Sequence, residues 1–197
     1  TLHLEKIAAH KGSMLGNLPG NAQPSQKMFE SRLFCALREF DASRPVFVEA
    51  ESRRIGSVQL PDAMLAMIRG SPCLRIEADL AARVDYLLRD YDYFLADPRW
   101  LVERLDQLRG LQSNETVDRW TQLVDTGEFP ALVAELLERH YDPLYRRSQD
   151  RGRTGAVPIH VAQDLSEKGI ASIAAEIIEA RYAAFVDGIR NAIDRRI

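Results

Sequence analysis

The 197-residue chain has a formal net charge of −3 and is 46% hydrophobic and 28% charged, a balance typical of an ordinary globular protein. Its length is enough for one good core, or for a domain with a smaller appendage. The weak negative charge excludes a global field that attracts nucleic acid, so any such contact needs a local basic patch. We see neither an apolar run long enough to span a membrane nor a signal peptide at the start.

The two cysteines, Cys35 and Cys73, stand far apart and form no C-x-x-C pair. This usage fits a reducing compartment and predicts that both thiols are buried and inert. We therefore expect a cytoplasmic protein that makes no contact with a membrane. The sequence leaves its oligomeric state open.

The first half of the chain alternates strand-like and helix-like segments, after residues 2–4, which resemble the end of a strand. The expected strands are residues 46–48 and 73–76, and the expected helices are residues 24–40, 61–69 and 80–91. The apolar face of the first of these helices is marked by Phe29, Leu33, Leu37 and Phe40. Alternation of strands and helices predicts an α/β fold with a parallel sheet and helices on its faces.

From residue 97 the pattern changes to consecutive helices, expected at residues 97–109, 114–126 and 129–140. An insertion of this size is large for a connection in a compact α/β domain. We therefore predict three parts: an α/β phosphate-binding part (1–96), a helical subdomain (97–150), and a last strand with a long helix that returns to the α/β core (151–197).

In the third part, residues 157–161 resemble a strand. The sequence Asp164-Leu-Ser-Glu167 resembles a capping box with Asp164 as the cap. It opens an amphipathic helix whose apolar face holds Ile170, Ile173, Ala174, Ile177, Ile178, Phe185 and Ile189.

The segment VFVEAESRRIG (46–56) changes within a few residues from an apolar run into charged residues. Glu49 and Glu51 point to the same side of an extended chain, because strand side chains alternate in direction. Ligands of open α/β sheets bind outside the carboxyl ends of the strands, where carboxylates can hold a metal or a proton. The adjacent Arg53 and Arg54 suit phosphate, whose oxygens match the guanidinium fork. The alternative is a strand that ends in a charged, solvated turn.

Two further segments favour anions. The loop His10-Lys11-Gly12-Ser13-x-x-Gly16 combines glycines, a lysine and a serine, although no Walker A sequence occurs in the chain. A mobile surface loop is the alternative. The start of the helix near Ser25 and Gln26 offers free amides and polar side chains. Ordinary helix capping is the alternative there, and the sequence alone favours it.

A basic segment with interleaved tyrosines follows the helical part. Arginine and tyrosine together can neutralise phosphates and stack on unpaired bases. The alternative is a helix end with cations that favour the helix dipole. The candidate RNA-binding residues are Arg139, Tyr145, Arg146, Arg147, Arg151 and Arg153.

Other residue types give weaker indications of a functional site. The four histidines show no metal-ligand spacing, so we predict no structural zinc. Trp100 and Trp120 lie at helical spacing and are expected in the core. No residue is an obvious nucleophile.

Taken in order, four elements resemble one family: HKGSMLGNLPG, QPSQKMFE, VFVEAESRRIG followed by LP, and a late W-x-x-L with ELLERHYDPLYRRS. Together they resemble bacterial tRNA 2-selenouridine synthase, also described as tRNA 2-geranylthiouridine synthase. The resemblance runs from about Leu2 to the end of the chain. His-Lys-Gly-Ser stands where the family more usually has His-Arg-Gly-Ser.

The resemblance implies a protein that joins an N-terminal rhodanese-like domain to a P-loop domain. This chain contains neither that domain nor the Walker A segment, which is expected just before Leu2. It therefore resembles the C-terminal portion of the enzyme. The implied fold is a P-loop NTPase-like, mostly parallel sheet that is incomplete at the missing strand, with a helical subdomain.

The implied activity is modification of the wobble 2-thiouridine of tRNA. The sulfur is geranylated from geranyl diphosphate, and the geranylthio group is then replaced by selenium from selenophosphate. The expected partners are tRNA and the upstream rhodanese-like domain. No tightly bound cofactor is expected, and Glu49 is the candidate ligand for a magnesium ion. The nucleophile in this reaction is the tRNA sulfur.

The residues and the resemblance together suggest roles. Arg53 and Arg54, with Glu51, are the candidate catalytic residues, because cations stabilise a departing diphosphate. The candidate phosphate-binding residues are Lys11, Gly12, Ser13, Ser25 and Gln26. Two alternatives stay open: a P-loop kinase or sulfotransferase relative acting on a small molecule, and a non-catalytic tRNA-binding fragment.

Overall fold

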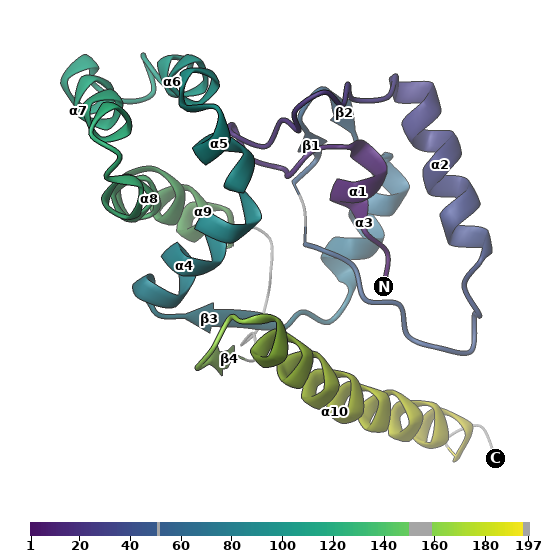
Figure 1. Cartoon of the computed structure of the whole chain (residues 1–197). Helices are drawn as coiled ribbons and strands as arrows, with labels where there is room; N and C mark the ends of the chain where they lie inside the picture. Colours follow the sequence, from purple (N-terminus) through teal and green to yellow (C-terminus); the bar gives the residue numbers. More distant parts are fainter. Residues whose placement is uncertain (51, 150–158, 195–197) are drawn as a thin grey trace.

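The computed structural model describes residues 1–50, 52–149 and 159–194 of the chain. Its elements form two groups joined by a small sheet (Figure 1). The N-terminal group contains α1 (Leu4–Ala8), α2 (Gln26–Arg38), β1 (Arg54–Ile55), β2 (Val58–Gln59) and α3 (Asp62–Gly70). The helical group contains α4 (Leu80–Asp90), α5 (Asp92–Ala96), α6 (Pro98–Asp106), α7 (Asn114–Asp125), α8 (Phe129–Leu136), the π-helical turn η1 (Leu137–Tyr141) and α9 (Asp142–Gln149). The chain is thus mixed α/β and rich in helix.

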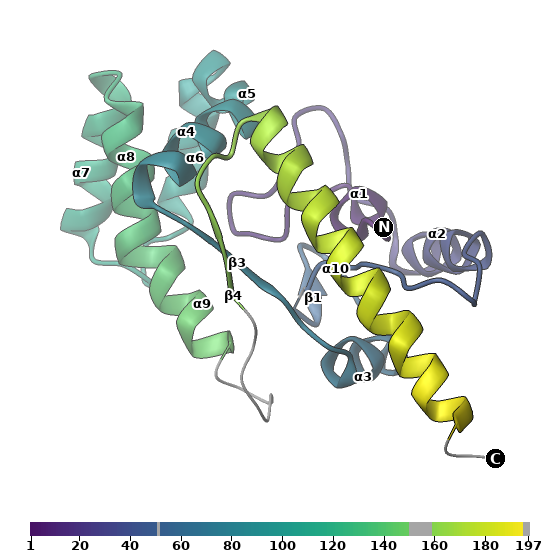
Figure 2. The same ribbon diagram turned by 90° about the horizontal axis from the view of Figure 1, so that it is seen from below.

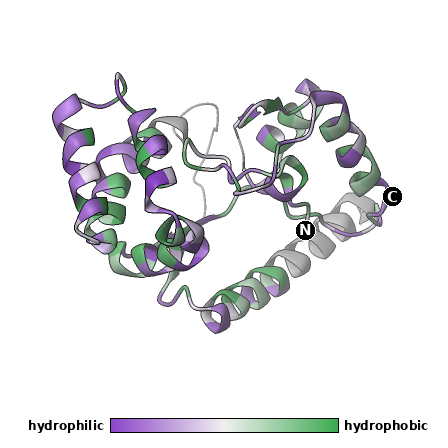
Figure 3. Cartoon of the chain, turned by 45° about the horizontal axis from the view of Figure 1, so that its top comes forward, coloured by the Kyte–Doolittle hydropathy of each residue, from purple (hydrophilic) through white to green (hydrophobic). Residues whose placement is uncertain are grey.

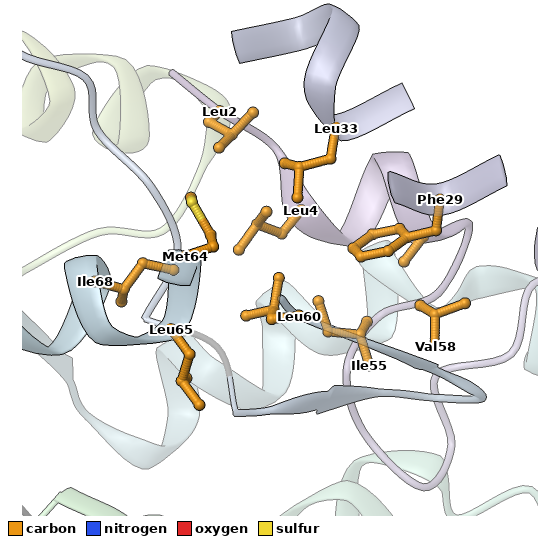
Figure 4. Packing of buried hydrophobic residues seen from close by; sticks show 11 residues of the cluster. Leu2, Leu4, Phe29, Leu33, Ile55, Val58, Leu60, Met64, Leu65 and Ile68 are labelled. Atoms are coloured by element: carbon orange, nitrogen blue, oxygen red, sulfur yellow. The ribbon is translucent and has the colours of Figure 1, made fainter. Parts of the chain in front are cut away.

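The N-terminal group packs its three helices and the antiparallel β1–β2 hairpin around one core. Figure 4 shows Phe29 and Leu33 of α2 facing Leu4, Ile55 and Val58. The rest of this core comprises Leu2, Ala8, Leu60, Met64, Leu65 and Ile68.

The buried face of α2 is rotated slightly from the predicted one. Ala36 and Phe40 pack against the core, whereas Leu37 is exposed. The 3.6-residue period places Ala36 and Phe40 near the centre of the face and Leu37 at its edge. The prediction for Cys35 is wrong for the same reason: two residues after Leu33, it points away from the core and is exposed, while Cys73 is half-buried.

The helical group has its own core, in which the side chain of Trp120 is fully buried, as predicted. Trp100 is half-buried and packs against this core, with its ring centroid 4.8 Å from that of Phe94. Figure 3 shows hydrophobic and hydrophilic stretches alternating along these helices, as expected for helices with one buried face. The core also takes in Leu15 from the loop before α2, far from residues 97–150. The proposed division into three parts stays a prediction.

The parallel sheet of the described residues is small. The strand β3 (Arg75–Ala78) pairs in parallel with β4 (Ile159–Ala162), Arg75 opposite Ile159 and Ala78 opposite Ala162. The predicted strand at residues 46–48 is reduced to a single parallel bridge between Val48 and Leu2, where the Leu2 amide donates to the Phe47 carbonyl at 2.7 Å. A strand needs a partner along its whole length, and this one has a partner at one end only.

The helix α10 (Glu167–Asp194) leaves the end of β4 and runs past the N-terminal group (Figure 2). It begins later than predicted, because Ser166 and not Asp164 is its cap: Ser166 Oγ accepts from the Gly169 amide at 3.2 Å. Asp164 instead accepts hydrogen bonds from the Ser166 hydroxyl and, at 2.7 Å, from the Ser166 amide. These two bonds lower the pKa of the Asp164 carboxyl. Of the predicted apolar face, Ile173 is buried while Ile170 and Ile178 are exposed. None of the helices in the described part of the chain combines the length and apolar character that a membrane crossing requires.

We expect Phe29→Ala to destabilise the protein by about 3–5 kcal/mol, because it removes a fully buried ring from the first core. The matched control is Phe34→Ala on the same helix, whose side chain is 62% exposed and whose loss should change stability by roughly 0.5 kcal/mol or less. Urea unfolding of both variants measures the difference. Equal losses of stability would contradict this assignment of the core.

Candidate anion site and apolar cavity

The side chain of Gln23 joins three segments of the N-terminal group. Its Nε2 donates to the carbonyls of Ala8 at 3.0 Å and Ile55 at 3.1 Å. Its Oε1 accepts from the Ser57 amide at 2.7 Å. The end of α1, the approach to α2 and the β1–β2 hairpin are therefore held together, and with them the three segments that the sequence singled out for anion binding.

The turn of the hairpin packs directly on the loop of residues 10–16. Gly56 has a φ of +59°, and a Cβ at this position would lie 2.7 Å from Cδ2 of His10 and 2.1 Å from Oε1 of Gln23. Glycine is thus required both by the backbone conformation and by the space. His10 is buried, and its Nδ1 accepts from the Gly12 amide at 3.1 Å. Burial lowers the pKa of His10, so the imidazole is neutral and holds the loop in shape.

Arg53 and Arg54 lie at the surface of this hairpin. Arg53 forms an ion pair with Asp62 at the start of α3. Nε of Arg54 donates to the Gly56 carbonyl at 2.8 Å. Both side chains are exposed, so neither interaction removes the guanidinium group from solvent.

The carboxylate of Glu49 caps α1. Its Oε2 accepts from the Leu4 amide at 2.7 Å, and its Oε1 lies 3.7 Å from Nδ1 of His3. No group of three or more histidine, cysteine or acidic side chains suited to a metal occurs among residues 1–50, 52–149 and 159–194. Glu51, the other predicted carboxylate, lies outside the described residues.

Ser25 and Gln26 have structural partners. Ser25 Oγ accepts from the Met28 amide at 3.3 Å, which is the ordinary helix capping that was the alternative for this residue. Gln26 pairs with the backbone of Gln59, donating to its carbonyl and accepting from its amide, each at 2.8 Å. The two side chains thus fix the start of α2 against the hairpin.

A cavity of about 320 Å³ lies between the helical group and the loop of residues 10–16. It brings together residues that the sequence assigned to two different tasks, Lys11 and Ser13 to phosphate binding and Tyr145 to RNA binding. Arg53, Arg54, Ser25, Gln26 and Glu49 do not line it.

Lys11 ties the loop to α4. Its Nζ donates to the Asp90 carbonyl and lies 2.6 Å from Asp90 Oδ2. The same nitrogen lies 4.4 Å from the ring centroid of Tyr91, a cation–π distance. With 19% of its side chain exposed, Lys11 is a largely enclosed cation whose charge is balanced by Asp90.

Ser13 lies beside two half-buried tyrosines, Tyr91 and Tyr141. Burial raises the pKa of both phenols, that of Tyr141 to about 12, so both are neutral. Next to Tyr141, Asp142 accepts a bidentate pair of hydrogen bonds from Arg83 of α4, one of them 3.1 Å long. Arg83, Tyr91 and Tyr141 were not predicted from the sequence; the cluster YDYF (91–94) was the available signal of an aromatic wall.

The predicted RNA-binding residues lie on the run from η1 to α9 and beyond. Arg139 and Arg146 are exposed, and Arg139 lies 3.9 Å from Glu135. Within the same segment His140 is buried, with its Nδ1 3.2 Å from Nε2 of Gln112. The side chain of Arg147, and the whole of Arg151 and Arg153, lie outside the described part of the chain.

Comparison with known proteins identifies relatives. The profile of the family described as "tRNA 2-selenouridine synthase AAA domain" matches residues 1–113. The tRNA 2-selenouridine synthase of Nitrosomonas europaea is 38% identical over 109 residues, which are 54% of this chain and 28% of that protein. That of Alcanivorax borkumensis is 42% identical over 92 residues, 46% of this chain and 25% of the relative.

A longer match, over 178 residues, is 28% identical to the tRNA 2-selenouridine synthase of Cupriavidus pinatubonensis and covers 75% of this chain and 48% of the relative. The chain thus spans half or less of the length of these relatives. No solved structure matches it. Since the family profile covers more than half of the chain, the chain belongs to the tRNA 2-selenouridine synthase family, in its AAA-domain region.

Proposed function

We propose that this chain is the substrate-handling portion of a transferase that modifies the wobble 2-thiouridine of tRNA, with geranyl diphosphate and selenophosphate as the other substrates. The observation that carries the proposal is the junction at Gln23, just before α2, which ties the end of α1 to the Arg53–Arg54 hairpin, while His10 at the start of the glycine-containing loop lies against the hairpin turn at Gly56. The three segments that the sequence predicts to bind anions therefore lie near one another, and the chain belongs to a family of tRNA-modifying enzymes.

In the first step the sulfur of 2-thiouridine attacks C1 of the geranyl group. The new C–S bond replaces the C–O bond to diphosphate, which leaves, and the uridine gives up its N3 proton. The nucleophile comes from the tRNA, so the protein must bind, orient and stabilise the departing charge. Arg53 and Arg54, exposed and adjacent, suit the departing oxygens, because fixed cations stabilise charge that develops in the transition state.

In the second step selenium from selenophosphate displaces the geranylthio group at C2 of the base. A C–Se bond forms and the C–S bond breaks, so the geranylthiolate leaves and takes up a proton. Water then attacks the phosphorus, the P–Se bond breaks, phosphate is released, and N3 of the base regains its proton. Both steps thus involve phosphate-bearing small molecules, and one anion site serves both.

Magnesium in this proposal arrives with the diphosphate. Glu49 already accepts the Leu4 amide, which leaves little capacity for a resident metal. Mg²⁺ typically binds through one or two carboxylates together with substrate phosphates. Glu51, in the same segment, is the candidate to orient the arginines.

The tRNA is proposed to lie along α9 and the residues that follow it. Arg139 and Arg146 are exposed on this run, and Tyr145 lines the cavity beside the loop. An RNA bound there has its base close to Lys11 and Ser13. The P-loop-like sheet and the rhodanese-like domain are further parts of the proposal, supported by the greater length of the relatives.

We expect an Arg53→Ala, Arg54→Ala double variant to lose geranyl transfer to tRNA by at least about a hundredfold while it stays folded, because removal of one charge-stabilising group costs on that order and exposed ion pairs contribute little to stability. The matched control is Arg32→Ala, Arg38→Ala, which removes two exposed arginines from α2. Two measurements on both double variants test this expectation: the rate of geranyl transfer from geranyl diphosphate to thiolated tRNA, and thermal unfolding. Unchanged turnover would remove Arg53 and Arg54 from the mechanism.

We expect an Arg139→Ala, Arg146→Ala variant to bind tRNA more weakly and with a flatter salt dependence, by about one unit of slope for each phosphate that the variant no longer neutralises. The measurement is tRNA affinity against salt concentration. Arg44→Ala, Arg69→Ala, two exposed arginines of the N-terminal group, is the control. If the slope and midpoint equal those of the parent, the segment is only a well-capped helix end.

A further inference from the structure

The cavity beside the loop has an apolar wall that has no role in the anion binding proposed above. Most of its lining is apolar and comes from α4, α6 and α8, including Leu87, Leu101, Phe129, Leu132, Val133 and Leu136. An apolar cavity of this kind offers water few of the two to four polar partners that an ordered water requires, and such cavities bind apolar molecules.

The polar part of the wall is gathered at one place. Ser13 lies beside Tyr91 and Tyr141, and Lys11 lies over the ring of Tyr91. Tyr141 is half-buried, but its hydroxyl is enclosed and has no hydrogen-bond partner of good geometry within the described residues. The cavity is thus apolar over most of its wall, and its polar lining includes these hydroxyls, the Lys11–Asp90 ion pair, Glu5 and Arg83.

The size of the cavity limits its occupant. At roughly 30 Å³ for each water-sized group, its volume of about 320 Å³ admits an apolar chain on the order of ten carbon atoms. This volume is at the low end of small-molecule pockets, which run from about 300 to 1,000 Å³. A nucleobase or an amino acid would leave most of this apolar wall without contacts, whereas a flexible hydrocarbon chain would cover it.

The loop of residues 10–16 contacts both the cavity and the β1–β2 hairpin. It lines the cavity with Lys11, Ser13 and Leu15, and it packs against the turn of the hairpin at Gly56 through His10. A molecule with its chain in the cavity therefore has its head group at the loop, which also contacts the hairpin that carries Arg53 and Arg54.

We propose that this cavity binds the hydrocarbon chain of an isoprenoid diphosphate of about ten carbons, and that the chain enters past Lys11, Ser13 and Tyr141. The proposal rests on the proposed function, which supplies an isoprenoid diphosphate as substrate. It adds the part of the protein that limits the length of the hydrocarbon chain: this chain contacts α4 and α8, and the diphosphate head group lies beside the loop.

The test measures binding of diphosphates with five, ten and fifteen carbons, and of inorganic diphosphate, to the purified protein by calorimetry. We expect the ten-carbon ligand to bind at least tenfold more tightly than the five-carbon one, since each buried methylene adds affinity. Val133→Trp fills the cavity and should weaken the ten-carbon ligand at least tenfold without changing inorganic diphosphate. Ala131→Trp, exposed on the same helix and outside the cavity, should change neither.

The inference is overturned if Val133→Trp and Ala131→Trp bind the ten-carbon ligand equally well, or if affinity does not depend on chain length. If thermal unfolding shows that Val133→Trp is misfolded, Val133→Ala decides: it enlarges the cavity and should shift the affinity ratio at least threefold toward the fifteen-carbon ligand, and no shift overturns the inference. Binding that depends on chain length, without transfer to tRNA, would support the cavity and refute the proposed function. Transfer to tRNA without any dependence on chain length would support the proposed function and refute the role of the cavity.

Discussion

The arrangement of the N-terminal group depends on one amide side chain. Gln23 satisfies two backbone carbonyls and one backbone amide from segments up to 34 residues away in the chain. Each such bond contributes roughly 1 kcal/mol net, but leaving its partner unpaired costs about 1–3 kcal/mol. Gly56 completes the constraint, because any side chain there would displace Gln23 and His10. The segments that the sequence predicts to bind anions are thus brought near one another by hydrogen bonds that only hold the fold together.

The loop of residues 10–16 belongs to both groups of elements. His10 packs against the hairpin turn, whereas Leu15 lies in the core of the helical group. Lys11 reaches across to Asp90, at the end of α4. Its charge is balanced there and is only partly exposed, so the loop owes its position to an enclosed ion pair as well as to apolar packing. The loop can therefore place a head group relative to both the cavity and Arg53–Arg54.

Most helices and the two strands of the parallel sheet lie within a few residues of their predicted bounds, whereas the predicted strand at residues 46–48 does not form, and the difference is physical. The helices after residue 97 appear within a few residues of their predicted bounds, because proline, glycine and apolar period are local signals. The strand at residues 46–48 has β-branched and aromatic residues, yet it pairs at Val48 alone, since pairing needs a partner that local sequence does not specify. The π-helical turn η1 had no signal in the residues. Ser166 rather than Asp164 caps α10, because two oxygen-bearing side chains two residues apart competed for that role.

The sequence by itself identified the family, and it singled out candidate site residues by their type and spacing. Lys11, Ser13 and Tyr145 were identified by residue type and spacing, but only the tertiary structure placed all three around one cavity. It likewise decided that Glu49 caps α1 and that Gln26 pairs with Gln59. The reason is separation along the chain: Lys11 meets Asp90 across 79 residues and Gln26 meets Gln59 across 33. Such contacts form only after the helices have packed, and no periodicity in the sequence encodes them.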